Sequence, residues 1–113
     1  MNFQIKEVGN IIIVYLYGRL DSSFSKEIVV DLFKIFYNNE KYHFIFNLEK
    51  IEFMSSNGIK IILNARDILK KNNKKIKLCC LSEPVKNVAS VIELSSIVEM
   101  YDSEDEALKS FAE

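Results

Sequence analysis

The chain has 113 residues, of which 49% are hydrophobic and 27% are charged, and its formal net charge is −1. This length and composition predict one globular domain over residues 1–113 and exclude a disordered chain. Fifteen basic residues against sixteen acidic ones leave no basic surplus of the kind that binds nucleic acid or an anionic membrane surface. The longest apolar run, 11–17, is far shorter than the roughly 20 residues of a membrane-spanning helix, and the N-terminus lacks the pattern of a secretion signal. We therefore expect a cytoplasmic protein without membrane insertion.

The first third of the chain predicts a β-hairpin followed by a helix. Segments 3–7 and 11–20 flank Gly9-Asn10, a turn pair that is typical of a hairpin. The second segment is apolar on both faces, which predicts an interior strand of a covered sheet. An apolar stripe of helical period then runs from Phe24 to Phe36. The candidate caps of this helix are Asp21, Ser22 and Ser23.

The middle of the chain predicts a strand, a helix and a basic loop. Residues 42–48 form an apolar, aromatic-rich strand. Because a helix separates it from the strand at 11–20, a right-handed crossover should make the two strands parallel. A helical pattern follows over 56–70. The lysine-rich run 70–75 suits the negative end of a helix dipole, so we expect a cap and a solvated loop there rather than a ligand site.

The last third predicts two more strands and two more helices. Residues 76–81 form a strand, and Ser82-Glu83-Pro84 opens a helix, since proline is tolerated in a first turn. A short strand is expected over 97–101. The spacing of Ser103 and Glu106 predicts a capping box at the start of a C-terminal helix. The expected inner stripe of the third helix is Val85, Val88 and Ile92.

The predicted order of elements is ββαβαβαβα. This alternation indicates an α/β fold, in which a mixed, mostly parallel β-sheet packs against helices in a single layered domain. The sequence contains no repeat, linker or low-complexity segment that would divide it.

Residues that support catalysis are scarce. His43, the one histidine, lies inside a predicted strand, where we expect a structural or sheet-edge role. Cys79 and Cys80 are neighbours on a predicted strand and point to opposite faces, so they are badly placed for a disulfide and are expected to be small buried hydrophobic residues. Three glycines form no phosphate-binding motif. We expect no enzyme, no metal and no cofactor, and weak nucleotide binding has no motif behind it.

Ser55 and Ser56 stand where the predicted helix 56–70 begins. Such a position presents free backbone N–H groups and the positive end of the helix dipole, which favour hydroxyl caps and negative groups. One interpretation is a simple N-cap, with Gly58 allowing close packing. The other is an exposed hydroxyl that accepts a phosphoryl group from a kinase, which itself supplies nucleotide and metal. Asp21 follows an adjacent parallel strand, so we expect it beside Ser56.

Three segments carry a resemblance to a known family. Residues 53–59, Phe-Met-Ser-Ser-Asn-Gly-Ile, resemble the Phe-Met-Asp-Ser-Ser-Gly-Leu signature of the STAS domain, as found in bacterial anti-sigma factor antagonists. Residues 18–21, Gly-Arg-Leu-Asp, resemble the family's Gly-x-Leu/Ile-Asp, and residues 101–108 resemble its acidic-Glu-Ala-Leu helix start. The three matches keep the family's order and cover nearly the whole chain.

The resemblance implies an anti-sigma factor antagonist with a STAS-like fold. Ser56 corresponds to the phosphoacceptor, with Ser55 as the alternative, while Ser55, Asn57 and Asn47 depart from the family's Asp, Ser and Asp. The implied partners are a kinase-like anti-sigma factor and a cognate phosphatase, and the implied process is sigma-dependent transcription. The implied partner-binding residues are Asp21, Ser22, Ser23, Ser55, Ser56, Asn57 and Gly58.

Two alternatives remain open at this point. The first is a STAS adaptor without phosphorylation, part of a stressosome-like or ABC-type lipid-transport assembly, and Ser55 in place of Asp favours it. The second is self-association as a homodimer. An exposed patch of aromatic residues would favour it, whereas aromatic residues that are covered would belong to the core. The aromatic residues in question are Tyr15, Tyr17, Tyr42 and Phe44.

Overall fold

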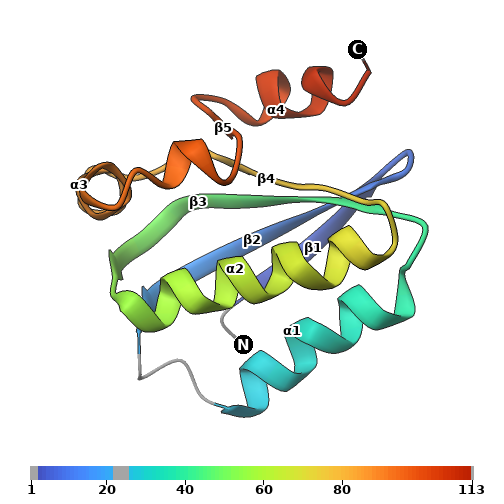
Figure 1. Ribbon diagram of the computed structural model, residues 1–113, viewed down its shortest axis with the longest axis horizontal. Helices are drawn as coiled ribbons and strands as arrows, with labels where there is room; N and C mark the ends of the chain where they lie inside the picture. The colour runs from blue at the N-terminus through green and yellow to red at the C-terminus, as the bar shows by residue number, and fades with distance from the viewer. Residues whose placement is uncertain (1–2, 22–25, 113) are drawn as a thin grey trace.

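The computed structural model describes residues 3–21 and 26–112, and within this part of the chain it contains one sheet covered by helices (Figure 1). The strands are β1 (Phe3–Val8), β2 (Ile11–Leu20), β3 (His43–Met54), β4 (Ile76–Cys79) and β5 (Met100–Tyr101). The helices are α1 (Lys26–Asn38), α2 (Ser56–Lys71), α3 (Glu83–Val91) and α4 (Glu104–Ser110), with a 3₁₀ turn at Leu94–Ser96. The predicted ββαβαβαβα order and α/β class are confirmed.

The strands lie side by side in chain order, β1 to β5. β1 and β2 are antiparallel, and the other neighbouring pairs are parallel. Gly9 has a φ of +59° in the tight turn between β1 and β2, a conformation that favours glycine. The predicted hairpin and the interior position of β2 are therefore confirmed.

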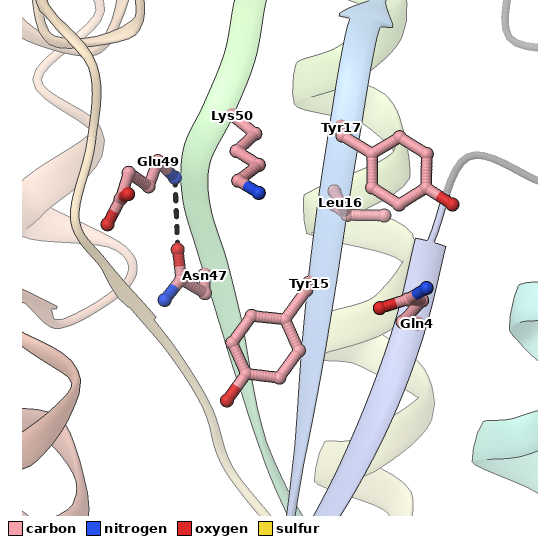
Figure 2. Close-up of a pocket in the computed structure, with 7 residues that line it drawn as sticks. All are labelled: Gln4, Tyr15, Leu16, Tyr17, Asn47, Glu49 and Lys50. Carbon is pink, nitrogen blue, oxygen red and sulfur yellow. Dashed lines mark hydrogen bonds between the residues drawn. The ribbon is translucent and has the colours of Figure 1, made fainter.

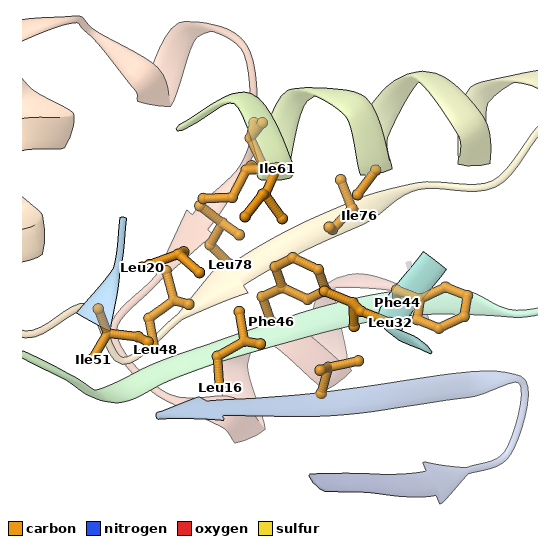
Figure 3. Packing of buried hydrophobic residues seen from close by; sticks show 14 of the residues in the cluster. Leu16, Leu20, Leu32, Phe44, Phe46, Leu48, Ile51, Ile61, Ile76 and Leu78 are labelled. Carbon is orange, nitrogen blue, oxygen red and sulfur yellow. The ribbon is translucent and has the colours of Figure 1, made fainter. Parts of the chain in front are cut away.

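The main core lies between the sheet and the pair α1 and α2, which Figure 1 shows side by side on one face. Leu16, Phe46 and Leu78, from three neighbouring strands, are fully buried there. They face Leu32 of α1 and Ile61 of α2 (Figure 3). Burial of such side chains contributes roughly 1.5–3 kcal/mol each, so this core holds the start of α2 firmly against the sheet. No helix in the described part of the chain has the length and apolar character needed to cross a membrane.

Helix α4 covers part of the opposite face of the sheet (Figure 1). Lys77 of β4 is buried beneath it: its ammonium group donates to Ser110 Oγ at 2.8 Å and lies 4.1 Å from the centre of the Phe111 ring. The carboxylate of Glu99 is 3.5 Å from the same ammonium group. At the other end of α4, Ser103 and Glu106 interact as N-cap and third residue: Ser103 Oγ accepts the Glu106 N–H at 3.1 Å and donates to Glu106 Oε1 at 3.1 Å. Sequence reasoning did not identify Lys77, because a lysine in a strand ordinarily faces water.

Strand β3 is longer than predicted, running to Met54 instead of ending at Leu48. The pairing of β3 with β2 shifts register twice, between Tyr15 and Tyr17 and again beyond Gly18. Asn47 supports the first irregularity, because its Oδ1 accepts the Glu49 N–H at 3.0 Å. Such bulges bend a strand without ending it, and the polar residues after Leu48 concealed the continuation.

The C-terminal elements are shorter than predicted. β4 ends at Cys79. β5 begins only at Met100, because a 3₁₀ turn at Leu94–Ser96 precedes it. Ile92 was expected on the inner stripe of α3, but it lies just beyond the helix and is 42% exposed. Both cysteines are free thiols, and Cys79 is buried as expected. Cys80 was also expected to be buried in this strand, but it lies beyond the end of β4 with a φ of +59° and is only partly buried.

His43 has the structural role that the sequence predicted. Its Nδ1 accepts the Lys75 N–H at 3.1 Å, and its ring lies 4.7 Å from the Phe111 ring. Partial burial, followed by the charges of Lys74, Lys77 and Lys75, lowers the pKa of His43. These causes favour the neutral form of the ring in the folded protein.

This environment predicts a pH-dependent stability. Because the folded-state pKa of His43 lies below its unfolded value of about 6.5, the unfolded chain takes up a proton first as the pH falls. The free energy of unfolding should therefore decrease below about pH 6.5. Urea unfolding from pH 7.5 to 5 measures the effect. His43→Asn should flatten the dependence, and equal slopes for both proteins would contradict the assignment.

Candidate functional site at the start of helix α2

Ser55 is the N-cap of α2. Its backbone is extended, and its Oγ accepts the Asn57 N–H at 3.2 Å. Its own N–H donates to the Leu20 carbonyl at 3.2 Å, and its carbonyl accepts the Ile59 N–H at 3.2 Å. The residue is half-buried, and its hydroxyl is already engaged in capping the start of the helix.

Ser56 is the first residue of α2 and is exposed. Its hydroxyl makes no hydrogen bond with the residues that the structure describes. Asn57 beside it is also exposed, and the first turn of α2 contains no acidic side chain. The positive end of the helix dipole is therefore uncompensated by an acidic residue of this turn, a setting in which a negative group is stabilised. Of the two hydroxyls, Ser56 is the one presented to solvent.

Asp21 lies next to this helix start, as predicted. Leu20 and Met54 are paired at the ends of the parallel strands β2 and β3, so Asp21 and Ser55 are the residues that directly follow them. The Asp21 carboxylate is mostly buried, and its Oδ2 is 3.0 Å from Arg19 Nε. Ser22 and Ser23, the other expected residues of this loop, lie outside the described residues.

Arg19 and Phe53 complete the exposed end of the two strands, and sequence reasoning did not identify them as part of the site. The two residues pair across β2 and β3, with the Arg19 guanidinium 4.5 Å from the centre of the Phe53 ring. Arginine over an aromatic ring is a favourable cation–π arrangement. The pairing of Arg19 with Phe53 was missed because β3 was expected to end at Leu48, which leaves Phe53 outside the strand.

Gly58 determines how closely α2 approaches the sheet. It is buried, and a Cβ at this position would collide with the Leu20 carbonyl oxygen and lie 2.7 Å from Met54 Cγ. Real Cβ atoms essentially never show contacts this short. Glycine is therefore required for the first turn of α2 to rest on the end of β2, and this contact holds the start of α2 against Leu20, the residue before Asp21.

A hollow lies elsewhere, on the side of the sheet away from α2 (Figure 2). It has a volume of about 580 Å³ and is lined by Tyr15, Tyr17 and the irregular stretch of β3. Burial and a hydrogen bond to Glu104 raise the pKa of Tyr15 to about 12. Phe44, by contrast, is in the core, and Tyr42 donates to Glu7 Oε2 at 2.7 Å. The four aromatic residues thus do not form one exposed patch.

The described part of the chain has no cluster of three or more histidine, cysteine or acidic residues that would hold a metal ion. What the start of α2 presents is a free hydroxyl, an amide, a carboxylate loop and an aromatic ring. These groups suit recognition by another protein.

Comparison with known families supports this assignment of the fold. Residues 2–107 match the model of the STAS domain. The chain belongs to the STAS domain family. STAS anti-sigma factor antagonists are non-enzymatic binding modules, which agrees with the expectation that this protein is not an enzyme. Among curated relatives, this STAS protein is similar to the anti-sigma F factor antagonist of Paenibacillus polymyxa, with 26% identity over 110 residues, 96% of this chain and 94% of the relative.

Solved structures with the same fold include two proteins described as anti-sigma factor antagonists. One is a Thermotoga maritima protein assigned as an anti-sigma factor antagonist, with a TM-score of 0.90 and 22% identity, covering 98% of this chain and 95% of that one. The other is the anti-sigma factor antagonist SpoIIAA in its unphosphorylated form, with a TM-score of 0.80 and 23% identity, covering 97% and 96% of the two chains. SpoIIAA from Bacillus has also been solved in its phosphorylated form, with a TM-score of 0.72 and 22% identity, covering 96% and 98%.

Proposed function

We propose that this STAS protein is a cytoplasmic anti-sigma factor antagonist whose binding to a kinase-like anti-sigma factor is switched by phosphorylation of Ser56. The observation that carries the proposal is that the two neighbouring hydroxyls have different environments. Ser55 caps α2 with its hydroxyl, whereas Ser56 is exposed and its hydroxyl is unengaged by the described residues. A kinase needs an accessible hydroxyl on accessible backbone, and Ser56 offers both.

The docking face in this proposal is the surface around the start of α2. It combines the exposed Ser56 and Asn57 with the Asp21 loop, and Ser22 and Ser23 belong to it as expectations from the family signature. Gly58 supports this face from beneath because it is buried against Leu20. Binding of the unmodified protein to the anti-sigma factor would release the sigma factor and so regulate sigma-dependent transcription.

Phosphorylation would change the docking face without unfolding the domain. A phosphoserine adds about −1.5 to −2 charges at neutral pH. The start of α2 would stabilise such a group by roughly 0.3–1 kcal/mol in an exposed setting. The added bulk and charge would stand on the exposed first residue of α2, so any acidic group of the partner would be repelled from this face. A cognate phosphatase would then restore binding.

A phosphorylation assay tests the proposal. The purified protein is incubated with the anti-sigma factor and Mg-ATP, and the modified residue is located by mass spectrometry. We expect one phosphate, on Ser56. Ser55→Ala keeps the acceptor and should still be modified, whereas Ser56→Ala should not. A phosphate on Ser55, or none on either residue, would contradict the proposed switch.

A second candidate keeps the fold and omits the switch. Ser55 occupies the position where the family usually has Asp, and this departure is the observation that favours a docking subunit of a stressosome-like or lipid-transport assembly. Co-purification from native extract distinguishes the two candidates. A nucleotide-binding kinase as the bound protein supports the first, and a transporter ATPase supports the second.

A further inference from the structure

A second hollow lies at the opposite end of α2, remote from Ser56. It has a volume of about 450 Å³ and is formed by the last turns of α2, the loop that enters β4 and the segment before β5. Figure 1 shows the two ends of α2 at opposite sides of the molecule. Arg66, Lys70, Lys74 and Lys75 lie around this hollow. Four cationic side chains thus converge on one concave surface of a chain whose net charge is −1.

Glu99, the acidic residue that also lines the hollow, is already paired. Its Oε1 accepts the Tyr101 hydroxyl at 2.8 Å and lies 3.5 Å from the buried ammonium group of Lys77. These interactions stabilise the carboxylate and lower the pKa of Glu99. The charge of Glu99 is therefore compensated by Lys77, and Arg66 is paired with Asp67, so the excess of positive charge at the hollow comes from Lys70, Lys74 and Lys75. Concave surfaces of one charge sign concentrate oppositely charged ligands.

Arg66 supplies an unsatisfied donor at this place. Its Nη2 is 3.1 Å from the exposed Asp67 carboxylate, but its Nε is buried and has no hydrogen-bond partner among the described residues. A buried donor of a charged group without a partner is costly. A small rotation of the guanidinium would let Nε and an Nη group donate together to two oxygens of one ligand, the forked geometry that suits phosphate.

One part of the wall of the hollow is apolar. Ile76 and Val98 are buried within it, and Ile97 is 43% exposed at its edge. An isolated inorganic ion would leave this apolar surface in water. A ligand that carries a non-polar group beside its anionic group would cover the isoleucine while its oxygens meet the cations.

We propose that this hollow binds a small phosphomonoester with an apolar body. The dianionic phosphate group would lie between Arg66 and the lysines at positions 70, 74 and 75, and the apolar body against Ile97. This site is separate from Ser56 and requires neither a kinase nor an anti-sigma factor. Ligand binding at this hollow would make the protein respond to the concentration of a metabolite. The protein partner would bind at the other end of α2, around Ser56.

Binding of phenyl phosphate to the unmodified protein tests the proposal, with inorganic phosphate as the comparison at equal ionic strength. Amide NMR shifts of residues 73–75 and 97–99 follow the titration at pH 7.5. We expect phenyl phosphate to bind about tenfold more tightly than inorganic phosphate, because only the former covers apolar surface. His43 is an independent reporter: a bound anion near Lys74 and Lys75 should raise the pKa of this histidine.

Matched double variants provide the control. Lys70→Ser with Lys74→Ser removes two cations of the hollow, and Lys26→Ser with Lys34→Ser removes two exposed cations of α1. The first variant should lose about tenfold or more in affinity, and the second should bind like the wild type. Equal affinities for the two variants, equal affinities for the two phosphates, or binding to anionic lipid vesicles without any response to phenyl phosphate would overturn the proposal. None of these outcomes depends on whether Ser56 is phosphorylated.

Discussion

Ser56→Asp is expected to weaken binding to the anti-sigma factor by about 100-fold, which corresponds to about 2.7 kcal/mol. The substitution places a fixed negative charge at the exposed first residue of α2, on the proposed docking face, where it would oppose acidic groups of the partner. Like charges brought together at an interface cost several kcal/mol. The helix itself should tolerate the change, because acidic side chains are favourable in a first turn. Isothermal titration calorimetry with the purified anti-sigma factor measures the loss.

Ser55→Asp is the matched control for this experiment. It adds the same charge one residue earlier, at the N-cap, where aspartate accepts the same backbone N–H as serine. We expect this variant to keep both the helix cap and partner binding. Ser56→Ala should likewise bind as the wild type does. Wild-type affinity for Ser56→Asp, with the anti-sigma factor shown to be active, would exclude Ser56 from the docking face.

Gly58→Ala is expected to lower the free energy of unfolding by about 2–3 kcal/mol. Intrinsic helix propensity predicts the opposite sign, since alanine is favoured over glycine by about 1 kcal/mol inside a helix. The steric overlap of the new Cβ with the Leu20 carbonyl and Met54 should cost more than the gain in helix propensity, because a backbone oxygen in a packed sheet cannot move aside. Urea denaturation measures the difference, and a gain in stability would show that α2 does not press on β2.

Gly9→Ala serves as the comparison for this effect. Gly9 has a positive φ but no atom near the position of an added Cβ. Its replacement therefore tests backbone strain alone, with an expected cost of about 1 kcal/mol. If Gly58→Ala lowers the free energy of unfolding more than Gly9→Ala does, the difference is the cost of the steric overlap. The surviving Gly58→Ala protein should also bind the anti-sigma factor more weakly, since the start of α2 moves relative to Asp21.

The periodic patterns of the sequence were sufficient for the order of elements. Glycine and asparagine at the hairpin, apolar stripes of helical period in α1 and α2, and Ser103 with Glu106 at α4 all act within a few residues of one another. The sequence likewise placed two hydroxyls at the start of α2 and an aspartate at the end of β2. Local interactions of this kind are strong enough to be recognised without tertiary contacts.

Only the tertiary structure decided which hydroxyl is free and what surrounds it. The extension of β3 to Met54 depends on pairing with β2, and that pairing brings Arg19 over Phe53. In the sequence, the lysines of 70–75 are only a solvated charge run and Arg66 stands apart from them. They line one hollow when the segment before β5 folds against α2. Contacts between residues distant in sequence leave no periodic signal, because each partner's environment is set by chain packing rather than by its neighbours.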